Sequence, residues 1–417
     1  MKDNLTSKKW YPWLVVALLW IVALLNYMDR QMLSTMRESM ALDIEALEST
    51  VEFGKIMAVF MWIYGFMSPV SGIVADRVNR KWLIVGSLAV WSTVTLLMGY
   101  AETYSEVYWL RAAMGISEAL YIPAALSLIA DYFTGKQLSL AIGIHMTGLY
   151  MGQAVGGFGA FVAKQLSWQQ TFHWFGLVGI IYAVVLMALL YEDKRAPRNE
   201  NPAAPFSFRK SVGAIGSNIG VLLANGAFWT ILFFFATCSI PGWSTKNWLP
   251  ELFASSLDIP MTEAGPYATI TIAFSSFIGV MVGGPLADRW SQRNLRGRIY
   301  TSAIGMTMMI PALVLMGYGA SLLSAILAGV IFGLGYGLFD SNTMPILCQF
   351  VNDRRRATAY GIMNMSGLFI GAVATNILGL LAESGRIGLG FVLMAGALVL
   401  AVVLQLALLK PTTLNAE

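Results

Sequence analysis

The sequence has few charged residues, histidines and cysteines. Only 12% of its 417 residues are charged, while 57% are hydrophobic. The two histidines, His145 and His173, lie in different apolar runs, so we predict no metal site and no cofactor. The two cysteines, Cys238 and Cys348, have no paired spacing and are interpreted as small buried hydrophobic residues.

Long apolar runs recur along the whole chain, each about 20 residues long, which is the length needed to cross a bilayer as a helix. Lipid cannot satisfy backbone hydrogen bonds, so every span must be helical. The sequence therefore predicts an all-α membrane protein. We expect twelve spans, near residues 12–34, 51–75, 82–101, 107–133, 138–163, 170–191, 217–241, 263–288, 298–316, 321–350, 356–382 and 387–409.

Lysine and arginine are concentrated in alternate connections, for example Arg77, Arg80 and Lys81 after the second span. Acidic residues dominate the opposite connections, as at Asp43 and Glu45. Because basic connections stay on the cytoplasmic side, both termini are predicted to be cytoplasmic. The net charge of +4 is then explained by topology, and we expect no nucleic-acid partner.

Several other classes of protein fit the sequence poorly. The first apolar run continues through Asn26 to Arg30 without a small-residue cleavage site, so it is interpreted as a span and not a secretory signal. No nucleophile–base pair or metal set is found in the spans, which disfavours an enzyme. A receptor would need a large soluble domain or signalling tail, and only seven residues follow Lys410.

Four charged residues lie inside apolar spans: Asp29, Arg30, Arg111 and Glu118. A charge at a helix centre costs roughly 2.5–3.5 kcal/mol on insertion scales, so such residues commonly mark a substrate or proton pathway. Arg111 and Glu118 are seven positions apart and face the same side of a helix. Asp29 and Arg30 are adjacent and point about 100° apart, so Asp29 needs another partner. The alternative is a network of paired charges that only stabilises the protein.

A repeated motif divides the chain into halves. GIVADRVNRK, with Gly72, Asp76, Arg77 and Arg80, is matched 212 residues later by GPLADRWSQR, with Gly284, Asp288, Arg289 and Arg293. Such internal repeats are typical of transporters built from two bundles. We predict an N-terminal bundle at 1–191, a polar cytoplasmic linker at 192–216 and a C-terminal bundle at 217–417. The motif is a candidate charge latch that closes the cytoplasmic side; a basic turn that only sets topology is the alternative.

These motifs, with Gly148, Gly152, Gly156 and Gly157 of the fifth span, resemble the signatures of the major facilitator superfamily over essentially the whole chain. NYMDRQMLS at 26–34 and RAAMGISEALYIPAA at 111–125 are similar to the anion:cation symporter family, which includes sugar-acid permeases and sialin. The same stretches also resemble the Spinster lipid transporters, so they do not separate these branches.

The resemblance implies roles for the membrane charges. In sugar-acid permeases, the positions of Asp29 and Glu118 exchange the coupling proton, and those of Arg30 and Arg111 hold the substrate carboxylate. Arginine suits that role because its planar guanidinium stays charged and matches a carboxylate. The permeases also use the positions of Tyr27 and Tyr64 for sugar hydroxyls. Without that match, tyrosines in a membrane are more often packing residues or interfacial anchors.

Further candidates come from the polarity of the spans. Gln153 and His145 lie on roughly one face of the fifth span, although His145 is equally a candidate core residue. Asp340 interrupts the tenth span, where it either accepts sugar hydroxyls or bonds another helix, and Asn364 lies in the eleventh. Lys246 is placed at the outer mouth. Trp243 and Trp248 are expected in an interfacial belt.

The chain departs from some relatives of the resembling family. Sialin-like members have a histidine where this chain has Leu126, and vesicular glutamate carriers have an arginine on the seventh span, whereas residues 217–241 contain none. We therefore predict a monomeric, multi-pass carrier in a bacterial inner membrane that imports a small organic anion with protons. An acidic sugar (hexuronate, aldonate or sialic acid) is favoured; a Spinster-like lysolipid carrier and a neutral-sugar carrier are the alternatives.

Overall fold

The computed structural model describes residues 8, 10–133, 135–192, 220–352 and 355–411. Within these ranges it is helical and contains no strand. The N-terminal helices are α2 (Tyr11–Leu33), α3 (Arg37–Ala41), the short 3-10 helix η1 (Glu45–Glu48), α4 (Thr50–Arg77), α5 (Arg80–Met98), α6 (Tyr104–Ala119), α7 (Tyr121–Tyr132), α8 (Gly135–Gly156), α9 (Gly159–Gln165) and α10 (Trp168–Leu189). The C-terminal helices are α12 (Gly226–Leu257), α13 (Met261–Ser291), α14 (Gly297–Tyr318), α15 (Leu322–Phe350), α16 (Arg356–Glu383) and α17 (Ile387–Leu408).

Eleven spans among the described residues are long and apolar enough to cross a membrane. Helix α8, at the place of the predicted fifth span, is not among them, so the count of twelve stays a prediction. The orientation of the termini also stays a prediction. The described helices nevertheless show that this is a multi-pass membrane protein.

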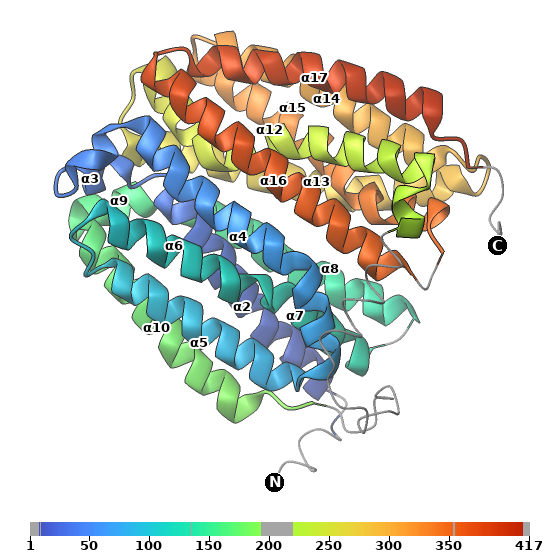
Figure 1. Ribbon diagram of the computed structural model, residues 1–417, viewed down its shortest axis with the longest axis horizontal. Coiled ribbons are helices and arrows are strands. Elements are labelled where there is room, and N and C mark those ends of the chain that lie inside the picture. Colours follow the sequence, from blue (N-terminus) through green and yellow to red (C-terminus); the bar gives the residue numbers. More distant parts are fainter. Residues whose placement is uncertain (1–7, 9, 134, 193–219, 353–354, 412–417) are drawn as a thin grey trace.

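The helices form two groups, with α2–α10 on one side and α12–α17 on the other (Figure 1). Helix α4 packs against α16 and helix α8 against α13, so these pairs join the groups. The predicted division at 192–216 stays a prediction, because residues 193–219 lie outside the described ranges.

Two predicted spans are each divided into two helices in the structure. The predicted span 107–133 is divided at Leu120 into α6 and α7, because Pro123 has no N–H to donate to the carbonyl of Ala119. The predicted span 138–163 is divided into α8 and α9. The predicted tenth span, 321–350, agrees with α15, which is continuous from Leu322 to Phe350 and contains Asp340.

The predicted seventh span, 217–241, ends too early. Helix α12 continues through Pro241 and Pro250 to Leu257, and Trp248, Leu249 and Leu252 are buried in its second half. Burial of these apolar side chains favours helix in a segment that two prolines would otherwise disfavour. The consequence is that Lys246 lies inside a helix and not at the outer mouth.

Close packing of α8 on α2 positions the helix that carries Asp29 and Arg30. A Cβ at Gly152 would lie 2.2 Å from the carbonyl oxygen of Leu24, and one at Gly148 would lie 2.6 Å from that of Trp20. Side chains at these positions would push the helices apart. The glycines predicted as a family signature thus bring the backbone of α8 against that of α2.

Candidate functional site

A polar centre lies where the two groups of helices face each other. We define it by Asp29 and Arg30 of α2, Arg111 and Glu118 of α6, and Lys246 of α12. The structure thus brings together the four charges that the sequence singled out and adds a fifth.

Glu118 and Arg30 form a buried ion pair. Arg30 Nε lies 2.5 Å from Glu118 Oε2, and the side chain of Glu118 has no exposed surface. Glu118 lies in the last turn of α6, just before the break at Leu120, so the break places its carboxylate against α2. A buried ion pair survives desolvation only with short, well-aligned contacts of this kind, and loss of either charge would leave the other unpaired.

None of the arginines that the structure describes forms an ion pair with Asp29. Its Oδ2 accepts a hydrogen bond from the hydroxyl of Thr95 on α5, with 2.9 Å between the oxygens. Among the described residues, its Oδ1 has no hydrogen-bond partner, although the carboxyl group is buried. Of the two carboxylate–arginine pairs expected in a purely structural network, the structure therefore contains only the pair of Glu118 with Arg30. Thr95 was not anticipated from the sequence; a hydroxyl in the middle of the third apolar run was the only available signal.

Arg111 is covered by apolar groups. It is only 3% exposed, its Nη1 lies 3.1 Å from the sulfur of Met114, and its guanidinium lies 4.8 Å from the centre of the Phe60 ring. No carboxylate lies within 4.0 Å of it in the described part of the chain, although it interacts electrostatically with Glu118 and Asp29. Arg111 therefore contributes positive charge to the polar centre from a buried position.

Aromatic rings surround Arg30. Its guanidinium carbon lies 4.9 Å from the centre of the Tyr27 ring, 5.0 Å from Phe60 and 4.8 Å from Tyr64. The face of an aromatic ring is electron-rich and attracts a guanidinium. Tyr27 and Tyr64, predicted as substrate residues, thus contact Arg30, which is also predicted to bind the substrate.

Lys246 extends the polar centre to the second group of helices, which corrects its predicted place at the outer mouth. Its Nζ lies 4.8 Å from the centre of the Trp243 ring, 5.7 Å from Tyr27 and 5.8 Å from Tyr336 of α15. The backbone carbonyl of Lys246 accepts a hydrogen bond of 2.7 Å from Gln31 of α2. The sequence interpretation missed this residue because it ended the seventh span at 241.

The predicted tryptophan belt is wrong for Trp248. This side chain is 1% exposed and lies between the groups, where its Nε1 donates to the carbonyl of Thr375, 3.0 Å away. Its ring meets Phe53 of α4 edge to face. Trp243 is half-buried against Lys246 and Gly371. Both rings pack inside the protein because α12 extends beyond the predicted end of its span.

The remaining candidates lie in different environments. Asp340 is exposed and lies on α15 one turn beyond Tyr336, whose ring lies near Lys246, so it lies next to the polar centre. Asn364 donates a hydrogen bond of 2.9 Å to Ser68 of α4, which links the two groups. Gln153 is buried in α8. His145 is fully buried with its ring edge-on to Tyr121 at 6.0 Å, in the packing of the first group.

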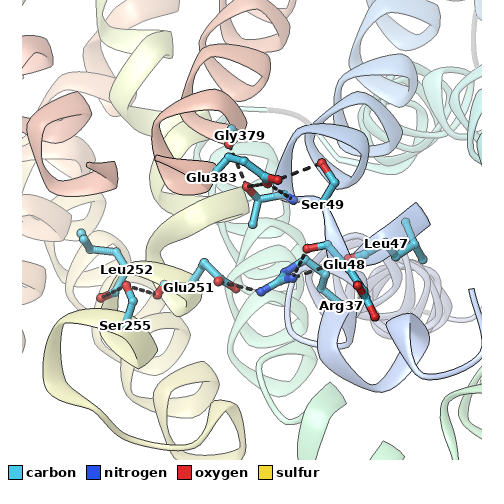
Figure 2. A network of polar contacts seen from close by, with 10 residues as sticks. Arg37, Leu47, Glu48, Ser49, Glu251, Leu252, Ser255, Gly379 and Glu383 are labelled. Carbon is cyan, nitrogen blue, oxygen red and sulfur yellow. Dashed lines mark hydrogen bonds and ion pairs between the residues drawn. The ribbon is translucent and has the colours of Figure 1, made fainter. Parts of the chain in front are cut away.

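The two groups are joined at the end of the molecule that carries residues 34–49, which we call the closed end. Arg37 Nη2 lies 2.8 Å from Glu251 Oε1 of α12, and the Thr50 N–H and hydroxyl both donate to Glu383 of α16 at 2.8 Å. Figure 2 shows both links, with Ser49 also directed at Glu383. These contacts fasten α3 and α4 to the second group of helices.

The predicted latch residues lie at the opposite end. Arg80 forms an ion pair with Asp131 at the end of α7, and Asp288 lies 2.6 Å from Arg298 across the turn between α13 and α14. Each pair lies within one group of helices and does not bridge the two. Arg289 is exposed. The side chains of Gly72, Asp76 and Arg77 lie outside the described residues, so the latch stays a prediction.

The two cysteines also differ. Cys238 is buried, as predicted, whereas Cys348 is half-buried, because it lies near the end of α15. Among the described residues, no group of three or more histidine, cysteine, aspartate or glutamate side chains has the arrangement of a metal site.

Comparison with known proteins agrees with this architecture. The chain is 25% identical over 402 residues to an MFS-type efflux pump of Mycolicibacterium smegmatis, covering 94% of this chain and 89% of that protein. It is 24% identical over 421 residues to the hexuronate transporter of Escherichia coli K12, covering 94% of each. It is 28% identical over 405 residues to protein spinster homolog 1 of Rattus norvegicus, covering 89% and 73%.

A solved structure shares the fold. The crystal structure of a bacterial homolog of the human lysosomal transporter Spinster, in an inward-facing and unoccupied conformation, matches with a TM-score of 0.76. The sequence identity is 20%, and the match covers 96% of this chain and 97% of that one. The resemblance inferred from the sequence motifs, to sugar-acid permeases and to the Spinster branch, is confirmed by these relatives. A family model described as Major Facilitator Superfamily matches residues 19–375 and again residues 276–416, and the chain therefore belongs to this family of membrane transporters.

Proposed function

We propose that the protein is a proton-coupled symporter that imports a small organic anion, with an acidic sugar such as a hexuronate, an aldonate or sialic acid as its substrate. The observation that carries the proposal is the buried pair of Glu118 and Arg30 beside Asp29 and Arg111. Carboxyl groups buried inside a membrane protein can take up and release a proton, and buried guanidinium groups can bind an anion.

Protonation of Glu118 links the proton to the anion. Arg30 is neutralised by the Glu118 carboxylate in the structure. When Glu118 takes up a proton, Arg30 loses its partner and the centre becomes more positive by one charge. An anion then restores neutrality, so proton binding strengthens anion binding and, by linkage, anion binding strengthens proton binding.

Asp29 is suited to pass the proton onward. It is held by a neutral hydroxyl donor, so its protonation does not break an ion pair. It also interacts electrostatically with Glu118, Arg111 and Arg30, so its charge depends on the state of the pair. We assign proton binding to Asp29 and Glu118 and anion binding to the cations of the polar centre. These are the roles implied by the family resemblance.

Alternating access follows from the two groups of helices. If the basic connections are cytoplasmic, the closed end with Arg37 and Glu251 faces the periplasm of a bacterial inner membrane. Import then requires that these links break as the two groups of helices move relative to each other.

A lysolipid carrier is the second candidate, favoured by the 28% identity to protein spinster homolog 1. We favour an anionic sugar because Lys246, which lies outside the stretches shared with the Spinster branch, offers the polar centre a further cation with no carboxylate within 4.0 Å among the described residues. A neutral-sugar carrier would leave Lys246 without an anion to bind. Thermal unfolding of the purified protein with D-glucuronate, D-glucose or lysophosphatidylcholine distinguishes the three, since a ligand stabilises the state that binds it. We expect stabilisation by D-glucuronate; stabilisation by the lysolipid alone would contradict the proposal.

The decisive test is Glu118→Gln in proteoliposomes. Glutamine cannot take up or release a proton, so we expect uptake of labelled D-glucuronate to lose its acceleration by an inward proton gradient. Glu45→Gln removes an exposed carboxylate in η1 and serves as the matched control. Undiminished gradient-driven uptake by Glu118→Gln would exclude proton coupling through this residue.

A further inference from the structure

Lys246 is a membrane cation held by aromatic rings. Tyr27, Trp243 and Tyr336 lie around its ammonium group, from α2, α12 and α15. In the described part of the chain, no carboxylate oxygen lies within 4.0 Å of its Nζ. Ring faces compensate only part of the cost of moving a cation out of water. This arrangement leaves Lys246 able to bind an anion without first losing an ion-pair partner.

The other two cations of the polar centre are less available. Arg30 is paired with Glu118 at 2.5 Å, and Arg111 is 3% exposed behind Phe60 and Met114. Lys246 is only half-buried. An anion that enters between the groups therefore meets Lys246 before it can reach Arg111, and without displacing Glu118 from Arg30.

Asp340 limits what kind of anion fits. It is exposed and lies on α15 one helical turn beyond Tyr336, whose ring centre is 5.8 Å from the Lys246 ammonium group. A carboxylate can accept hydrogen bonds from sugar hydroxyls, but it repels a second carboxylate on the ligand. The rings of Tyr27 and Tyr336 offer flat apolar faces on which the C–H groups of a sugar can pack.

We propose that Lys246 holds the single carboxylate of a polyhydroxy acid, that Asp340 accepts hydroxyl groups from the same molecule, and that dicarboxylic sugar acids are discriminated against. This inference rests on the proposed function and makes it more specific. It places the ligand carboxylate on Lys246 of the second group of helices, while Arg30, once Glu118 releases it, and Arg111 add the positive charge that draws the anion to the polar centre.

Isothermal titration of the purified protein with D-glucuronate and D-glucarate tests the assignment. We expect Lys246→Gln to weaken D-glucuronate binding by about tenfold or more, since a hydrogen bond to a charged group is lost. Lys246→Arg keeps the charge and should retain most of the affinity. Lys55→Gln is the matched control, because Lys55 is an exposed lysine paired with Glu52 at the start of α4.

A second variant tests the discrimination. Asp340→Asn removes the repulsion and should raise the affinity for D-glucarate relative to D-glucuronate by about tenfold. This ratio is informative even if Lys246→Gln does not fold. An unchanged ratio would overturn the inference.

The two proposals fail in different ways. If the wild-type protein binds D-glucuronate and Lys246→Gln, folded as judged by thermal unfolding, binds it equally well, Lys246 is not the anchor and the proposed function stands. If the wild-type protein binds none of a hexuronate, an aldonate and sialic acid, the proposed function is wrong and the inference falls with it.

Discussion

Asp29 and Glu118 are both buried carboxyl groups, but the atoms around them differ. Glu118 is bound to a guanidinium, whereas Asp29 is bound to a hydroxyl that can also turn away. Protonation of Glu118 therefore releases a cation that can bind an anion, while protonation of Asp29 breaks no ion pair. This difference suits Glu118 to the coupling step and Asp29 to the exchange of the proton with solvent.

Thr95→Val tests this division. The hydroxyl stabilises the charged form of Asp29, so its loss should let Asp29 keep its proton at higher pH. We expect the pH of half-maximal D-glucuronate uptake to rise by about one unit, because one hydrogen bond contributes roughly 1 kcal/mol. Thr93→Val is the control, since the Thr93 hydroxyl is exposed and bonds the carbonyl of Ala89 in its own helix. A pH profile that does not move would show that Thr95 has no influence on the proton site.

At the scale of helices, apolar length and glycine spacing were informative, whereas helix ends were not. The motifs around Asp29 and Arg111 identified the charged helices because charges are rare in apolar runs. Lys246 was misplaced because prolines and a lysine normally end a span, and only tertiary burial of Trp248 and Leu252 shows that α12 continues. Thr95 was missed since a lone hydroxyl in a span is unremarkable until its neighbour across the bundle is known.

Gly152→Ala tests the close approach of α8 to α2. The added methyl group would lie 2.2 Å from the Leu24 carbonyl oxygen, so the helices must separate. We expect a loss of about 1–3 kcal/mol in the free energy of unfolding, measured by thermal or denaturant unfolding in detergent. Gly143→Ala lies in the same helix with open space around it and should be nearly neutral. Equal stability of the two variants would show that the packing yields at little cost.

At the scale of the whole molecule, two short links fasten the groups of helices together at the closed end. Arg37–Glu251 and Thr50–Glu383 both join α3 or α4 to the second group of helices (Figure 2). Their partners are more than 200 residues apart in sequence, so the pairing could not be inferred without the fold. Each link is partly exposed, and its contribution is therefore modest.

Charge reversal tests the Arg37–Glu251 link. Arg37→Glu should move the population toward opening at this end by about fivefold, as expected for a loss of roughly 1 kcal/mol, and adding Glu251→Arg should restore it. Spin labels at Leu42→Cys and Asp258→Cys, in a background without Cys238 and Cys348, report the distance between the groups. A distance distribution that is the same in all three proteins would show that the ion pair does not influence closure.

The ring of Tyr27 lies against cations from both halves, Arg30 at 4.9 Å and Lys246 at 5.7 Å from its centre. The two cations are therefore no farther apart than the sum of these distances, and they repel each other whenever Glu118 is neutral. A carrier loaded with a proton but no anion must then bring two like charges together in order to close. That repulsion would disfavour closure of a carrier that holds a proton but no anion. It would thereby prevent protons from leaking across the membrane without substrate.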